Sequence, residues 1–307
     1  MIFIDLIKHF NNELHPEFQK ILDLGFSSQF HPGDMLLWKI NGFYDDYLAA
    51  IQPHEGTKLN PHVIGPGTKG HSEQTHYDFI NQYRHSNISK NTFTDYLEKV
   101  KYDPEKKEEI DKLVSFESIS IQIEMLIYLK FWEADLIIKK FYELTRILNG
   151  EPYDWYFKVS ESSRDIDSTG TRQEIIRKLI RDKLDKRSDL LKDWITSIYK
   201  TQIRNSIAHS NYSIIARNIN LNNYIKNDQA AQIRNIEFDE WHKIFHKLLL
   251  LHNEYIWLGN SINDIYANRF LDGEKIEILI TEKNGKQYSY ELDYDENYKT
   301  WGYKRNS

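Results

Sequence analysis

A long apolar helical run is the feature that most constrains the fold of this chain. From about Phe116 to Leu148, apolar residues recur around most of a helix, which indicates burial on more than one side. The run ends at Asn149-Gly150 with Pro152 just beyond, a typical signal for a helix C-terminus. At about 1.5 Å per residue such a helix spans roughly 50 Å. We therefore expect a mainly α-helical protein in which this helix is the spine of a bundle.

The sequence on either side of this helix predicts three parts. Residues 1–113 are expected to be a mostly helical N-terminal region, interrupted at 52–76 by an irregular loop rich in Pro, Gly and His. Residues 114–262 are expected to form the helical bundle. Residues 263–307 are expected to be a small C-terminal appendage.

Three further elements are predicted beyond the spine helix. A helix from Glu240 to about Leu258, with Asp239 as its N-cap, has a wide apolar face and would close the bundle. The stretch 218–235 is rich in Asn and poor in core residues, which favours a loop. Near the C-terminus, two runs of alternating residues flank Asn284-Gly285, and this pattern predicts a β-hairpin.

The composition of the chain argues against several classes of protein. The formal net charge is −6, from 40 Lys and Arg against 46 Asp and Glu, which argues against broad nonspecific coating of nucleic acid. The chain has no cysteine, so disulfides and thiolate zinc sites are excluded, and a cytoplasmic location is expected. No membrane span is expected, because the most apolar run, 119–138, is interrupted by polar and charged residues. No signal peptide is expected, because residues 1–10 include Asp5 and Lys8 and no small-residue cleavage site follows.

The segment 52–76 also raises the question of a metal site, because it holds four histidines: His54, His62, His71 and His76. None of them lies two or three residues from another, and no cysteine or carboxylate pattern accompanies them. A surface loop is therefore favoured over a metal site, and we predict neither a metal nor a cofactor for this protein.

Chemistry is concentrated in the segment from Trp194 to His209, which is predicted to be one helix from about Asp189 onward. Helical spacing places His209 and Asn205 on the same face as Trp194 and Leu191. This face therefore changes from apolar to polar along the helix, which is typical of a helix that ends at an interface or lines a site.

Glu133 is a charged residue on an otherwise apolar part of the spine helix. It lies near Leu126, Leu129 and Leu136 by helical spacing, so it is expected to have a cationic or hydrogen-bonding partner. The alternatives are a solvated edge of the helix or a structural ion pair with Lys130 or Lys140. Asp135, near Lys139, is expected to be exposed.

In the run Arg204-Asn205-Ser206-Ile207-Ala208-His209 the sequence resembles the HEPN superfamily, whose members carry Arg and His four to six residues apart, often with a polar residue after the Arg. The resemblance extends over about 116–260: a long helix with Trp132-Glu133, the motif helix and a closing helix. It implies a HEPN-like four-helix bundle. It also implies a homodimeric, metal-independent endoribonuclease used as a toxin or antiphage abortive-infection effector, with RNA as substrate and with an antitoxin or regulatory partner possible. A noncatalytic HEPN-like binding or dimerisation module is the alternative.

The resemblance also implies roles for individual residues. His209 would be the general acid or base, and Arg204 would stabilise charge on the phosphate. Asn205 would orient the imidazole or bind a phosphate, and Glu133 would position Arg204 or His209. On a regular helix Arg204 and His209 point about 140° apart, which leaves two alternatives: the two side chains meet within one subunit, or across two subunits. Tyr212 is the third residue after His209, whereas HEPN toxins paired with nucleotidyltransferase antitoxins have a tyrosine at the second, so regulation through Tyr212 is doubtful.

Overall fold

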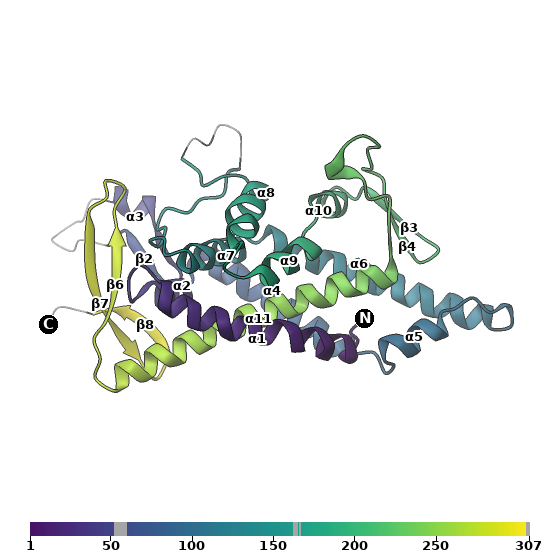
Figure 1. The fold of residues 1–307 in the computed structure, drawn as a ribbon, viewed down its shortest axis with the longest axis horizontal. Coiled ribbons are helices and arrows are strands. Elements are labelled where there is room, and N and C mark those ends of the chain that lie inside the picture. Colours follow the sequence, from purple (N-terminus) through teal and green to yellow (C-terminus); the bar gives the residue numbers. More distant parts are fainter. Residues whose placement is uncertain (52–59, 162–164, 166, 305–307) are drawn as a thin grey trace. The chain divides into compact units, whose positions relative to one another are not determined.

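The computed structural model describes residues 1–51, 60–161, 165 and 167–304 (Figure 1). The chain divides into two compact units. Unit 1 comprises Met1–Glu17, Glu73–Ala134 and Leu190–Glu254. Unit 2 comprises Phe18–Ser72, Asp135–Asp189 and Tyr255–Ser307, of which 305–307 lie outside the described residues. Each unit is thus assembled from three separated segments, and helices α1 (Ile4–Ser28), α4 (Gly67–Ser86) and α11 (Phe238–Leu271) contribute residues to both.

Unit 1 is helical apart from one small sheet. Its other helices are α5 (Phe93–Lys99), η1 (Pro104–Lys106), α6 (Lys107–Glu133), α9 (Asp189–Ile198), α10 (Thr201–Ala208) and η4 (Gln229–Ala231). The sheet is antiparallel, in the order β3 (Tyr212–Ile215), β4 (Asn218–Leu221) and β5 (Asn235–Glu237). Its core is rich in aromatic side chains that are almost fully buried, among them Phe3, Tyr128, Phe131, Trp241 and Phe245.

Unit 2 combines short helices with two antiparallel sheets. Its helices are α2 (Asp34–Ile40), α3 (Asp46–Ala50), α7 (Asp135–Leu148), α8 (Arg172–Glu174), the π-helix η2 (Ile175–Arg181) and η3 (Asp182–Leu184). One sheet pairs β1 (Gly42–Tyr44) with β2 (His62–Ile64). The other has the order β6 (Ile276–Thr281), β7 (Gln287–Asp295) and β8 (Thr300–Tyr303).

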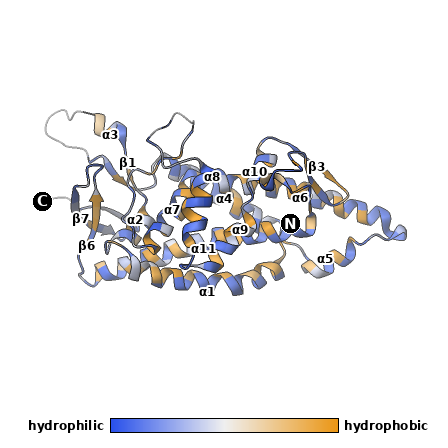
Figure 2. Ribbon diagram, turned by 45° about the horizontal axis from the view of Figure 1, so that its top comes forward, coloured by the Kyte–Doolittle hydropathy of each residue, from blue (hydrophilic) through white to orange (hydrophobic). Residues whose placement is uncertain are grey.

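The predicted fold class is confirmed at its coarse level, because most described residues outside the loops lie in helices. Figure 2 shows apolar and polar residues alternating along α1 and α11, as expected of helices that bury one face. The C-terminal β-hairpin is confirmed as β6 and β7, with Gly285 in the turn at φ +83°, and β8 adds a third strand that the sequence did not indicate. The domain boundaries predicted at 113/114 and 262/263 fall inside α6 and α11.

The predicted spine helix is two helices. It begins earlier than expected, at Lys107, and is interrupted at Ala134, whose φ of −74° and ψ of 106° are extended. Asp135 then opens α7, where its carboxylate is favoured by the helix dipole. The predicted C-terminus is confirmed: the N–H of Gly150 bonds to the carbonyl of Ile147, with Gly150 at φ +71°.

Other local predictions were wrong where strands or helices replace expected loops. Residues 62–64 form β2, and α4 begins at Gly67, so the irregular segment is shorter than predicted; residues 52–59, with His54, lie outside the described part of the chain. The stretch 218–235 contains β4 and the start of β5. Asp239 is not the N-cap of α11, because the helix already begins at Phe238. Among the described helices, none is both long enough and apolar enough to cross a membrane.

Candidate functional site

The segment that carries the Arg-Asn-x-x-x-His motif is a short helix, not the end of a long one. Helix α9 ends at Ile198, and α10 begins at Thr201 after Lys200 adopts an extended conformation with φ −125° and ψ 117°. The hydroxyl of buried Tyr128 donates to the carbonyl of Ile198 at 2.9 Å and accepts from the N–H of Lys200 at 3.3 Å. The predicted continuous face from Leu191 to His209 is therefore wrong, because the break resets the helical phase.

The C-terminus of α10 sets the position of His209. His209 is the C-cap residue, and its N–H bonds to the carbonyl of Asn205 at 3.1 Å. The N–H groups of Ser210 and Asn211 bond to the carbonyls of Ile207 (3.1 Å) and Ser206 (2.7 Å), which is the hydrogen-bond pattern of a Schellman motif. Because the helix ends here, His209 is exposed at the C-terminus of α10.

Ser210 provides a test of this helix end, because it adopts φ +51° at the position where helices usually carry glycine. Replacing Ser210 with glycine is expected to raise the free energy of unfolding by about 0.5–1 kcal/mol by removing the left-handed strain of a residue with Cβ. Urea denaturation measures this change. The matched control is Ser115→Gly, an exposed serine inside α6, which is expected to lower stability by about 0.5 kcal/mol. A loss of stability in both variants would contradict the Schellman geometry.

Arg204 is fixed by two side chains. Its Nε donates to Oε1 of Glu133, the last residue of α6, and its Nη1 donates to Oδ1 of Asn205 at 2.8 Å. The side chains of Arg204 and Glu133 are 27% and 33% exposed, so the pair lies at the surface of unit 1 and is not sealed in the core. The predicted cationic partner of Glu133 is thus Arg204. Asn205 contacts the guanidinium rather than the imidazole.

The electrostatics of this cluster keep the guanidinium charged. The hydrogen bond to Glu133 is the largest influence and raises the pKa of Arg204 above its usual value, although partial burial opposes it. These two bonds use Nε and Nη1, and no described residue accepts a hydrogen bond from Nη2. The planar group thus keeps donors with which it can hold a phosphate oxygen.

His209 is not joined to Arg204 within one chain. Among the described residues, no hydrogen bond or ion pair connects the imidazole to Arg204, Asn205 or Glu133. Tyr212 lies on β3, where it is half-buried and pairs with Leu221. The structure therefore brings together Arg204, Asn205 and Glu133, and it leaves His209 and Tyr212 outside that set of contacts.

Gln202 is a residue of this region that sequence reasoning missed. It is buried on α10, where its side-chain amide accepts from the N–H of Ile233 at 2.9 Å and donates to the carbonyl of Ile233 at 2.8 Å. Asn223 donates to the backbone carbonyl of Gln202 at 3.0 Å. These bonds tie α10 to the loop between β4 and β5. The sequence shows only a glutamine two residues before Arg204, and its partners are distant in sequence.

Sequence reasoning also missed a partly buried cluster of charged residues in unit 1. Arg217 donates to both carboxylate oxygens of Glu117, at 3.0 and 2.9 Å, and to Asp239 at 2.7 Å. His242 donates from Nε2 to Glu117 at 2.9 Å, and both side chains are fully buried. Burial alone would raise the pKa of Glu117, but His242 and Arg217 together hold it below its usual value. The cluster joins α6, the β3–β4 turn and α11, and Asp239 belongs to it instead of capping α11.

The described histidines of residues 52–76 do not come together at one site. His62 is buried on β2, where its Nε2 lies 3.2 Å from the hydroxyl of Tyr156, whereas His71 and His76 belong to α4. Within the described ranges, no group of three or more His, Asp or Glu side chains is arranged to hold a metal ion.

The expectation that Asp135 is exposed was wrong. Its side chain is 18% exposed and forms ion pairs with Lys69 (3.1 Å) and Arg172 (2.8 Å). The neighbouring Lys139 is buried as well. Asp135 and Lys139 lie among the apolar residues of α7, which was a signal of this burial, but the sequence does not show which residues surround them.

No protein-family model, curated protein or solved structure matches this chain. The interpretation of the site accordingly depends on its own residues. These are a fixed and partly exposed guanidinium, a carboxylate and an amide that hold it, and an exposed imidazole five residues further along the chain.

Proposed function

We propose that this chain is a metal-independent endoribonuclease of the HEPN type that acts as a homodimer. The observation that carries the proposal is the arrangement at α10: Arg204 is held by Glu133 and Asn205, while exposed His209 caps the same helix. An oriented guanidinium and an accessible imidazole on the same helix are the groups that phosphate chemistry without a metal requires.

The proposed reaction uses the 2′-hydroxyl of RNA as the nucleophile. His209 of one subunit takes the proton of the 2′-hydroxyl as its oxygen attacks the adjacent phosphorus. The bond from phosphorus to the 5′-oxygen breaks, and that oxygen receives a proton from a second group, for which the partner's imidazole is suited. Arg204 stabilises the negative charge that builds on the phosphate oxygens. The products are a 2′,3′-cyclic phosphate and a free 5′-hydroxyl.

Separation of His209 from Arg204 within one chain favours a dimeric site. A surface suited to a second copy lies on α6, where Phe116, Ile119, Ile123 and Leu126 are between 36% and 68% exposed. Their spacing of three and four residues places them on one helical face, the pattern of helices that pair. The same face continues to Glu133, so a contact between two α6 helices would run up to the Arg204 cluster.

Replacing Ile119 with lysine tests this dimer. Ile119 is 54% exposed, so the variant should fold normally, but a charge in the apolar contact should convert the dimer to a monomer and reduce RNA cleavage with it. Light scattering after gel filtration gives the mass, and thermal unfolding verifies the fold. The matched control is Ile225→Lys, since Ile225 is 56% exposed and lies outside α6. A dimer that persists in Ile119→Lys would place the contact elsewhere.

RNA cleavage by the wild-type chain in EDTA tests the activity itself. The purified protein should cleave RNA and leave 2′,3′-cyclic phosphate ends, which end-group analysis detects. Induced expression should inhibit growth, because we further propose a cytoplasmic toxin or antiphage abortive-infection effector, restrained by an antitoxin or another regulatory partner. Cleavage that requires a divalent metal, or products with 3′-hydroxyl ends, would contradict the proposal.

The alternative function is a noncatalytic HEPN-like binding or dimerisation module. The ion pair between Arg204 and Glu133 favours this alternative, because such a pair can have the purely structural role of linking α10 to α6. This alternative expects a folded dimer that cleaves no RNA at any protein concentration.

A further inference from the structure

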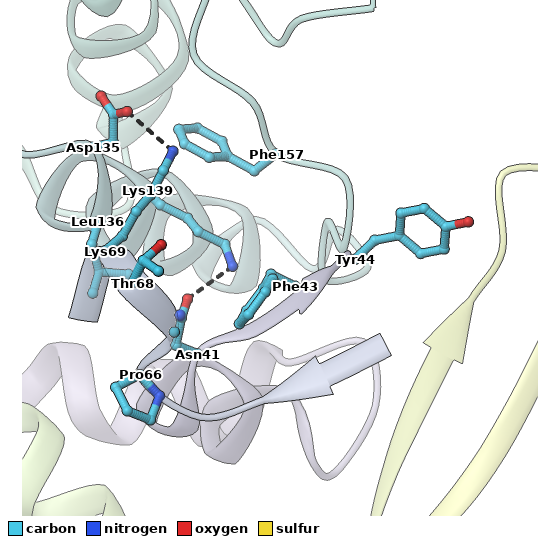
Figure 3. A pocket seen from close by; sticks show the side chains of 11 residues that line it. Asn41, Phe43, Tyr44, Pro66, Thr68, Lys69, Asp135, Leu136, Lys139 and Phe157 are labelled. Atoms are coloured by element: carbon cyan, nitrogen blue, oxygen red, sulfur yellow. Dashed lines mark hydrogen bonds and ion pairs between the residues drawn. The ribbon is translucent and has the colours of Figure 1, made fainter. Parts of the chain in front are cut away.

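Unit 2 contains a small cavity far in sequence from the motif. It lies where β1, the first turn of α4 and the first turns of α7 meet, and its volume is about 190 Å³ (Figure 3). Its walls are mainly apolar and include Phe43, Leu136 and Phe157. A cavity of about 150 Å³ accommodates benzene, so this one has room for a six-membered ring with one small substituent.

One wall of the cavity carries a buried cation. Lys139 of α7 is only 6% exposed, and its Nζ donates to Oδ1 of Asn41 at 2.9 Å and to the carbonyl of Gly42 (Figure 3). Both acceptors are neutral, whereas an ammonium group has three donors. No carboxylate among the described residues forms an ion pair with this Nζ. A buried cation without a bonded anion is costly, and an anion entering the cavity would lower that cost.

Glu143, a neighbouring acid, does not compensate the positive charge of Lys139. Burial lowers the pKa of Lys139 to about 8, so the amine is still mostly protonated at pH 7. Glu143, one turn further along α7, has its pKa raised by burial to about 8 and is therefore mostly neutral at the same pH. Asp135, four residues before Lys139 on α7, also lines the cavity, but its carboxylate is paired with Lys69 and Arg172. The charge of Lys139 is thus retained, while that of Glu143 is suppressed.

The first turn of α4, which also lines the cavity, likewise favours a negative group. Gly67, Thr68 and Lys69 form the first turn of α4, and the first hydrogen bond of that helix runs from the N–H of Gly70 to Pro66. The N–H groups before it have no acceptor within the helix. Gly67 has φ +59°, and an added Cβ would lie 3.0 Å from the ring of Phe43, so glycine is required for this close approach.

From this arrangement we propose that the cavity binds a small carboxylate with an aromatic or apolar body. The carboxylate faces Lys139 and the first turn of α4, and the body packs against Phe43, Leu136 and Phe157. This site lies in unit 2 and does not depend on RNA cleavage, so the two proposals can fail separately.

Binding of benzoate to the full chain tests the site, with benzyl alcohol as a neutral compound of similar size. Titration calorimetry should show benzoate binding at least tenfold more tightly than benzyl alcohol, and benzoate should raise the melting temperature. Lys139→Met should abolish the preference for benzoate. Thr68→Trp should block binding from the exposed rim and leave the interior hydrogen bonds intact, which keeps the test valid if Lys139→Met does not fold. The control Lys178→Met removes the same charge from an exposed position in the same unit and should bind like wild type.

Four results would overturn the assignment. Equal binding of benzyl alcohol would mean that the cation contributes nothing. Undiminished benzoate binding in both Lys139→Met and Thr68→Trp would place the ligand elsewhere. Binding of inorganic phosphate in preference to benzoate would exclude a role for the apolar walls. Absence of benzoate binding to wild type would mean that Lys139 only ties α7 to β1.

Discussion

Replacing His209 with alanine is expected to slow RNA cleavage by about 10²–10⁴-fold, the usual contribution of a general acid or base. The imidazole is exposed at the end of α10 and bonds to no described residue, so its removal should leave the free energy of unfolding within about 0.5 kcal/mol of wild type. Initial rates on a fluorescent RNA in EDTA give the activity, and urea denaturation gives the stability.

The matched control is His85→Ala, because His85 is also exposed in the last turn of a helix, α4, and belongs to unit 1. This variant should cleave RNA at the wild-type rate. Arg204→Ala should also lose about 10²–10³-fold in rate, as expected when a donor to the developing charge is removed. If His209→Ala retained full cleavage, His209 would not be the general acid or base, and the proposed site would be wrong.

Replacing Glu117 with glutamine is expected to lower the free energy of unfolding by about 3 kcal/mol. Glu117 is fully buried, and its carboxylate binds both Arg217 and His242. A neutral amide would leave the guanidinium without its buried counter-charge, and such breakage is far more costly than loss of a surface pair. Urea denaturation at pH 7 measures the difference.

The same variant should reveal a pH dependence with a definite sign. The pKa of Glu117 is below its usual value in the folded state, so the carboxylate contributes stability that is fully present above the unfolded pKa of about 4.3. That contribution is lost as the pH falls through the lower, folded pKa. The gap between wild type and Glu117→Gln should therefore be constant from pH 7 to about pH 5 and shrink below about pH 4.

Glu109→Gln is the control for this experiment, because Glu109 is exposed on the same helix, α6. It should lose less than about 1 kcal/mol. If Glu117→Gln were no less stable than Glu109→Gln, or if its deficit did not shrink in acid, the ion pairs of Glu117 would contribute nothing net to folding.

Local signals predicted those parts of the fold that are decided by neighbouring residues. The helix end at Gly150 and the turn at Gly285 were predictable, because each depends on a glycine that adopts positive φ within a few residues of chain. The helix interruptions at Ala134 and at Tyr199-Lys200 could not be predicted in this way. The second is held by the hydroxyl of Tyr128, which lies about seventy residues earlier. Strands β3 to β5 were not predicted for a similar reason, because their pairing depends on partners across the sheet.

The sequence by itself predicted which side chains make up the candidate site, and it also indicated that Glu133 needs a partner. A charge among apolar residues must be compensated, and that requirement can be read without coordinates. Only the tertiary structure decided that the partner is Arg204, that Asn205 bonds to the guanidinium, and that the imidazole of His209 bonds to neither of these two residues. The reason is physical: helical periodicity fixes directions only within one unbroken helix. The meeting of α6 with α10, and the place where α10 begins, depend on contacts between residues far apart in the chain.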